Sequence, residues 1–452
     1  MSRTADSNQT DEVRWNLQPA FARLEQWRSD QWRKGIDKEL ASIERALTCQ
    51  EAEVSFGKLL NLDSELSAIY SARTLLAYSG EETSIGEAEL AWLNHVTGNF
   101  IDRCRQVATA LCRTPETLSS NMVAWCDGIL QEGLPASVRD PGLALNERWR
   151  GGQLSMDELL LRRKNLDPDH LILKQRFKDN GLSKSDDIFP LEYQMESQRY
   201  FSELLDRSGH TELSLEALHD LEKQGFDSIS LSLNQTLEVF RRLCLELDKD
   251  LFDEVRSIVT SGRMQIIQDE ECMDLCVDTP YGSYVQVQYD ESLNSAVCLA
   301  HEMGHAMHQY MHRNSEKHYL PLTPVESETY ALAFENSFLK TLRKVEPCWS
   351  KEIANYVVHR RVEMNHRHRM LGRFEQGILH PDVQSADDIN RLWVTMNRLL
   401  YGEATLLDGE FSTAWSEIHH LVTAPFYLAV YSEAKEVADR AGLDSLVRQW
   451  RI

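Results

Sequence analysis

Apolar residues recur every three or four positions along most of this chain, and this spacing restricts it to a mainly helical fold. Residues 20–47, 215–226 and 434–450 each combine an apolar stripe with a charged opposite face, the pattern of an amphipathic helix. Proline and glycine, which interrupt helices, number only 12 and 21 among 452 residues. We therefore predict a mainly α fold. Such helices usually pack against one another, so we give them no chemical role.

One segment departs from the helical spacing. In residues 284–289, Tyr284, Gln286 and Gln288 alternate with Val285, Val287 and Tyr289. This period of two, together with residues that favour β-structure, predicts a β-strand within a small sheet. Directly after it, Asn294 and Ser295 are the predicted capping residues of a helix. Elsewhere, clusters of turn residues predict the ends of helices, at 112–120, 132–142, 165–171, 186–193 and 381–388.

The charge balance limits the partners of the chain. Lysine and arginine number 48 against 71 aspartates and glutamates, which gives a net charge of −23. This balance argues against nucleic acid or an anionic membrane as the main partner, because both require basic patches.

The remaining composition predicts a cytoplasmic protein. Nine cysteines without a paired pattern suit a reducing compartment, and Cys272 with Cys276 has no second pair that would complete a structural zinc site. The N-terminus lacks the basic start and apolar core of a signal peptide, and no stretch approaches the roughly 18 apolar residues of a membrane span.

Residues 299–309, LAHEMGHAMHQ, carry the main chemical motif. His301 and His305 are four positions apart with Glu302 between them, the spacing H-E-x-x-H. On an α-helix this spacing returns a side chain to nearly the same face, so the two imidazoles can bind one metal ion. Glu302 points about 100° away from His301, which suits a general base that takes a proton from water acidified by zinc. His308, further along the helix, is expected to support the site or lie on the surface.

A strand, a turn and an H-E-x-x-H helix follow one another in the order in which zinc peptidases build their cleft. The strand can pair with the backbone of an extended peptide, and Tyr284 and Gln286 are the side chains that we expect to contact it. This order predicts a peptide as the substrate.

A catalytic zinc ion takes three protein ligands and leaves one position for water. In residues 323–339, Glu328 and Glu335 are seven positions apart, about 20° from the same helix face. A carboxylate on an apolar face is costly unless it meets a metal or a partner. We therefore predict Glu328 as the third ligand and Glu335 as a carboxylate that orients a ligating histidine. Glu326 points to a different side of the helix. The alternative to a metal ligand is that these glutamates form a solvated acidic face at the start of a helix, where the helix dipole favours glutamate.

Residues 285–309 resemble the catalytic segment of oligoendopeptidase F, within the thimet oligopeptidase class of zinc metallopeptidases. The likeness runs through most of the chain, with its specific motifs in residues 280–435. The other stretches that agree in order are RWNLQPAF (14–21), RFEQGI (373–378), LLYGEA (399–404) and IHHLVTAPFYLAVYSEA (418–434).

The resemblance implies a large helical two-lobed body with a deep cleft that excludes folded proteins. It makes His301 and His305 zinc ligands, Glu302 the base and Glu328 the third ligand. One Zn²⁺ ion is implied.

The resemblance also implies a closing helix that carries His420, Tyr427 and Tyr431. Tyr431 would donate a hydrogen bond to the oxyanion, Tyr427 would contact the substrate, and His420 would help to hold the substrate carbonyl. His419 is a rival for His420. Without the resemblance, these tyrosines would be interpreted as core or interface residues.

The chain also departs from the family. Ala331 stands where the family usually has serine, residues 275–286 replace a glycine-rich stretch, and the chain is shorter before residue 280. These regions shape substrate pockets, so the departures concern which peptides are turned over and not hydrolysis itself.

We therefore predict a zinc metallopeptidase that hydrolyses short unfolded peptides. Residues 1–245 would form one wall of the cleft, and residues 246–452 would form the catalytic region. A dedicated peptide in a biosynthetic pathway is a narrower form of this hypothesis, and a noncatalytic helical binding protein with a structural zinc ion is the alternative. The sequence does not determine peptide preference, endo or exo cleavage, or the oligomeric state.

Overall fold

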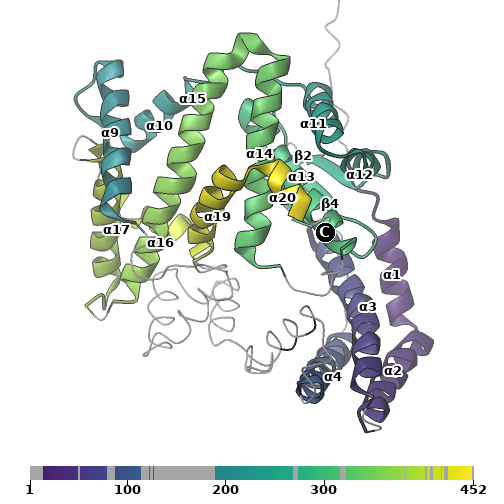
Figure 1. Ribbon diagram of the computed structural model, residues 1–452. Helices are drawn as coiled ribbons and strands as arrows, with labels where there is room; N and C mark the ends of the chain where they lie inside the picture. The colour runs from purple at the N-terminus through teal and green to yellow at the C-terminus, as the bar shows by residue number, and fades with distance from the viewer. Residues whose placement is uncertain are drawn as a thin grey trace, which may run out of the picture. The chain divides into compact units, whose positions relative to one another are not determined.

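Figure 1 traces the part of the chain that the computed structural model describes. Most of its residues are helical, and a small sheet packs against the H-E-x-x-H helix, which confirms the predicted fold class. None of the helices in this described part combines the length and apolar character needed to cross a bilayer. The described residues are 14–48, 51–78, 87–112, 122, 126, 189–267, 273–315, 322–380, 382–402, 405–407, 411–418, 420–421 and 426–449.

The chain divides into two compact units, and each unit combines two stretches of sequence. Unit 1 contains Met1–Pro135 and Leu231–Leu320, and unit 2 contains Ala136–Ser230 and Pro321–Ile452. The predicted regions, with their boundary after residue 245, do not coincide with these units.

Unit 1 begins with helices that share one apolar core around Trp27. The spacing predicted one helix over 20–47, but the chain forms two helices, because Ser29 adopts an extended conformation with φ −73° and ψ 132°. These first helices, purple to blue in Figure 1, are α1 (Gln18–Arg28), α2 (Asp30–Thr48), α3 (Ala52–Tyr78) and α4 (Glu87–Leu111).

The second stretch of unit 1 forms a three-stranded sheet with the order β2-β4-β3. The strands and helices of this stretch are α11 (Leu233–Leu247), α12 (Lys249–Thr260), β2 (Met264–Ile267), β3 (Leu275–Val277), β4 (Tyr284–Gln288) and α13 (Leu293–Arg313). The predicted strand is β4, which pairs in parallel with β2 and antiparallel with β3. β2 therefore covers one edge of β4 at Val285–Gln288 and β3 covers the other edge at Tyr284–Gln286, so this part of the strand pairs within the sheet and not with a peptide backbone.

Unit 2 surrounds a second apolar core, which includes Phe201, Phe374 and Trp415. The helix predicted over 434–450 is broken by Gly442, which has a positive φ of 69°. The α-helices among the described residues of this unit are α9 (Leu191–Ser208), α10 (Leu215–Lys223), α14 (Pro324–Val345), α15 (Ser350–Arg361), α16 (His368–Ile378), α17 (Ala386–Tyr401), α19 (Tyr427–Ala441) and α20 (Leu443–Gln449).

The described residues of unit 2 also form short elements. The π-helix η3 (Val362–Arg367) joins α15 to α16. The others are β1 (Leu213–Ser214), which pairs in parallel with β5 (Thr405–Leu406), and the 3₁₀ helices η2 (Pro347–Trp349) and η4 (Phe411–Glu417).

The helices α14 and α19 pack together and run in the same direction. The Tyr427 hydroxyl donates to Glu328, and the Lys435 ammonium donates to Asn336. In both pairs the partners are 99 residues apart, so the two helices keep their register over two turns.

Candidate active site

The helix α13 carries the H-E-x-x-H motif and has a well-defined start. Ser292 is its N-cap, and the Ser292 hydroxyl accepts a hydrogen bond from the Ser295 N–H at 3.1 Å. The sequence predicted Asn294 and Ser295 as the caps. The helix begins earlier because Glu291 turns the chain between strand and helix with a positive φ of 64°.

His301 and His305 face one another on α13. Their Nε2 atoms are 3.1 Å apart, and their rings lie at 85° with centroids separated by 4.7 Å. Two ligands bonded at about 2.0–2.1 Å to a tetrahedral ion lie roughly 3.3 Å apart. The observed separation therefore fits two ligands of one zinc ion.

Glu302 and the residues near it form a poorly solvated environment. Glu302 is 8% exposed. Burial, together with the carboxylates of Glu302 and Asp278, raises the pKa of the Cys276 thiol well above its usual value, so this thiol stays protonated and weakly nucleophilic. Burial and the neighbouring imidazoles lower the pKa of His308 to about 3, so His308 is a neutral, buried residue of this helix.

Glu328 belongs to unit 2, where α14 presents it. Thr323 and Glu326 form a capping box: the Thr323 N–H donates to Glu326 at 2.9 Å, and the Glu326 N–H donates to the Thr323 hydroxyl at 3.2 Å. Glu326 is therefore engaged at the helix start. Glu328 is only 2% exposed, and its Oε1 accepts a hydrogen bond of 2.6 Å from the Tyr427 hydroxyl.

Glu335 is held by an arginine of a neighbouring helix. The Arg360 guanidinium donates to both oxygens of Glu335, at 3.0 Å and 3.3 Å, and also to Glu363 at 2.9 Å. Burial would raise the pKa of Glu363, but Arg360 and other nearby cations lower it to about 2. The orientation of a ligating histidine by Glu335 stays a prediction.

The predicted residues of the closing helix lie together in unit 2. The rings of His420 and Tyr427 are stacked with centroids 6.1 Å apart, and Tyr427 meets Tyr431 edge-on at 5.5 Å. Tyr431 in turn lies against His368 at 5.1 Å. The alternative residue His419 lies outside the described residues.

His368 and Arg360 were not predicted from the sequence. Burial, with nearby Arg360, Arg367 and His420, outweighs the attraction of Glu363 and lowers the pKa of His368 to about 4, so its imidazole is neutral at pH 7. The sequence does carry a pattern that could have indicated His368 and Arg360: six of the ten residues 359–368 are histidine or arginine. A π-helix in the same stretch is a feature often found at functional sites.

Tyr284 and Gln286 have buried side chains that bond to their own chain. The Tyr284 hydroxyl donates to the Asn16 carbonyl at 3.2 Å, and the Gln286 amide donates to the Met273 carbonyl at 3.0 Å. Their predicted contact with a substrate stays a prediction.

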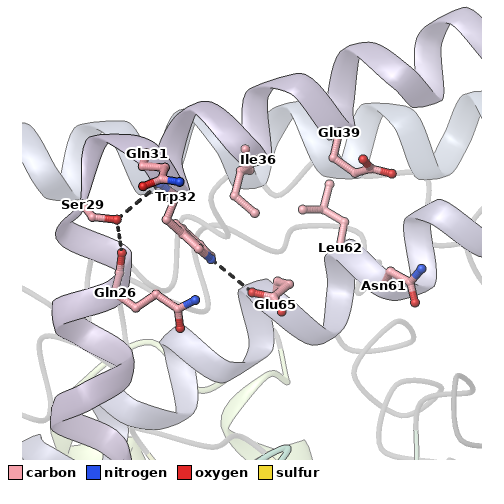
Figure 2. Close-up of a pocket in the computed structure, with 10 residues that line it drawn as sticks. Gln26, Ser29, Gln31, Trp32, Ile36, Glu39, Asn61, Leu62 and Glu65 are labelled. Carbon is pink, nitrogen blue, oxygen red and sulfur yellow. Dashed lines mark hydrogen bonds between the residues drawn. The ribbon is translucent and has the colours of Figure 1, made fainter.

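Unit 1 also contains a pocket of about 650 Å³ among α1, α2 and α3. Figure 2 shows its lining, in which the Trp32 indole donates to Glu65 at 3.2 Å. The lining residues include no histidine and no cysteine. This pocket therefore lacks the groups that the predicted chemistry requires.

The comparisons with known proteins agree on the fold. No family model and no curated protein sequence matches the chain. Among solved structures, PZ peptidase A with an inhibitor has a TM-score of 0.64 and 13% identity, over 91% of this chain and 87% of that chain.

Two provisionally assigned oligoendopeptidase F structures are also similar. One has a TM-score of 0.60 and 12% identity over 91% of this chain and 87% of that chain. The other, from Bacillus anthracis, has a TM-score of 0.55 and 9% identity over 92% of this chain and 94% of that chain. The chain therefore has the fold of these oligoendopeptidase structures, and the resemblance seen in the sequence is confirmed at the level of the fold.

Proposed function

We propose that this chain is a zinc-dependent peptidase that hydrolyses short, unfolded peptides. His301, His305 and Glu328 would hold one zinc ion, since each offers one ligand atom of a type that zinc prefers. The observation that carries the proposal is the Nε2 separation of 3.1 Å on α13, which fits two ligands of one ion. The peptidase fold of the structural neighbours supports peptides as the substrate class.

The chain supplies the remaining groups for hydrolysis. When bound, the zinc ion would polarise the scissile carbonyl and acidify water. Glu302 would take a proton from the attacking water and pass it to the leaving amine. Tyr431 and His420 would donate hydrogen bonds to the carbonyl oxygen as it gains negative charge. Tyr427 would hold the Glu328 carboxylate through the bond of 2.6 Å and contact the peptide with its ring.

The experiment combines metal analysis with a panel of quenched fluorescent peptides. The wild type is expected to bind zinc and to cleave peptides, and a chelator should abolish cleavage until zinc is restored. Glu302→Gln should lower kcat by on the order of a thousandfold without changing zinc content, because it removes only the base. Glu328→Gln should lower zinc content.

Glu326→Gln is the matched control on the same helix, because glutamine also completes a capping box. Its zinc content and kcat should equal those of the wild type. A wild-type protein that binds zinc and cleaves none of the peptides would contradict the proposal and favour the noncatalytic binding protein.

A further inference from the structure

Phe426, directly before α19, has a backbone conformation that is unusual for a bulky side chain. Its φ is 62° and its ψ is 5°, in the left-handed region. Among the described residues other than glycine, it shares a positive φ only with Glu291. The β-carbon is crowded in this region, so the conformation persists only where the surroundings hold it. Phe426 is also buried, at 5% exposed.

Glu375 of α16 provides a contact that holds this turn. Its Oε1 accepts a buried hydrogen bond of 2.9 Å from the Phe426 N–H. A carboxylate at this place also approaches the N-terminus of α19, where N–H groups lack partners within the helix and carry partial positive charge. The bond therefore stabilises both the buried carboxylate of Glu375 and the left-handed residue.

The turn at Phe426 determines where Tyr427 points. Tyr427 is the first residue of α19, and its hydroxyl donates to Glu328 at 2.6 Å. The body of α19 is bonded to α16 through Glu436 and Arg369, more than two turns beyond Tyr427. The bond between Glu375 and the Phe426 N–H, in contrast, lies at the N-terminal end of α19, next to Tyr427.

We propose that Glu375 is a positioning residue for the metal site. It holds Phe426 in the left-handed conformation and thereby presents the Tyr427 hydroxyl to Glu328. The inference rests on the proposed function, in which Glu328 is a zinc ligand. Loss of a partner that orients a ligand typically costs about 10- to 100-fold in metal affinity. Glu375 thus influences zinc binding without touching the ion or the peptide.

The first test compares Glu375→Leu with Glu375→Gln in the full-length protein. Leucine removes the acceptor for the Phe426 N–H, whereas glutamine keeps an oxygen acceptor of the same reach. In competition with a zinc-binding dye, Glu375→Leu should lower zinc affinity at least about tenfold, and Glu375→Gln should stay within about threefold of the wild type. Hydrogen exchange of the peptide that spans residue 426 should accelerate in Glu375→Leu and not in Glu375→Gln.

The second test asks whether Glu375 acts through Tyr427. Tyr427→Phe should lower zinc affinity by a factor similar to that of Glu375→Leu. In the Tyr427→Phe background, Glu375→Leu should add less than about twofold, because the bond that it positions is already absent. Glu436→Gln, at the other end of the same helix pair, is the control and should leave zinc affinity within about twofold of the wild type.

The outcomes separate this inference from the proposed function. Full additivity of Glu375→Leu and Tyr427→Phe, or unchanged exchange at residue 426, would overturn the positioning role. Zinc affinity that depends on both residues, without peptide cleavage by the wild type, would overturn the proposed function alone. A wild type that binds no zinc would overturn both. If circular dichroism shows that Glu375→Leu does not fold, Glu375→Asp, which is shorter by one methylene, replaces it with the same expectations.

Discussion

At the scale of single residues, unit 2 buries imidazoles in the neutral state, and His366 is one example. It is 2% exposed, its ring meets Tyr193 edge-on at 5.6 Å, and its Nε2 lies 3.4 Å from the Glu196 carboxylate. Burial outweighs the attraction of Glu196 and, with Arg361 and Arg369 nearby, lowers the pKa of His366 to about 4. The contact with Glu196 at neutral pH is therefore not an ion pair.

This pKa makes stability depend on pH. The unfolded chain binds a proton at His366 near pH 6.5, whereas the native protein binds it only near pH 4, so stability falls as the pH is lowered between these values. Between these pH values, the free energy of unfolding falls by up to about 3 kcal/mol. Urea denaturation of the wild type and His366→Gln from about pH 7.5 to 4 checks this. The stability advantage of the wild type should shrink as the pH falls, and a constant difference would contradict the expectation.

At the scale of helices and strands, local spacing predicted the elements that carry the motif. The strand before α13 and the α13 helix itself depend on short-range periodicity, which the sequence displays. The break at Ser29 was missed because the apolar stripe continues through it. The turn at Phe426 was missed for a different reason: its support comes from Glu375, 51 residues away. Long-range contacts of this kind leave no local pattern.

Arg360 is another long-range link, since it joins α15 to α14 and to the π-helix η3. Its guanidinium bonds to Glu335, which is 3% exposed, and to Glu363. Removing one partner of a buried ion pair typically costs about 3–5 kcal/mol, because the other charge stays buried. Arg360→Met should therefore lower the free energy of unfolding by about this amount.

The double variant Arg360→Met with Glu335→Leu is the control for this prediction. It removes both charges of the Arg360–Glu335 pair and leaves only the more exposed Glu363 carboxylate, so it should recover most of the lost stability, as measured by urea denaturation. A double variant that is less stable than Arg360→Met would show that packing, and not the unpaired carboxylate, dominates at this place.

At the scale of the whole molecule, both units depend on segments that are far apart in sequence. In unit 1, the Trp15 indole donates to the Val285 carbonyl of the central strand at 3.0 Å, and Trp15 belongs to the same core as Tyr284. In unit 2, the ring of Phe201 lies 4.7 Å from that of Tyr401. Periodicity predicted the helices but not this pairing of stretches, because a helix that buries one face does not specify its partner. Each core therefore needs both of its stretches.

The isolated fragment 246–452, which the sequence predicted as the catalytic region, is therefore expected not to fold. It lacks α1 to α4, which share an apolar core with β3 and β4 of unit 1, and α9 with α10, which share the core of unit 2. The apolar faces left exposed should bind a hydrophobic dye, and circular dichroism should show no cooperative thermal transition. The fragment 1–245, expressed together with it, supplies the missing stretches and should restore a cooperative transition and copurify. If fragment 246–452 alone unfolds cooperatively and binds zinc with the affinity of the full chain, its core is complete without the N-terminal helices.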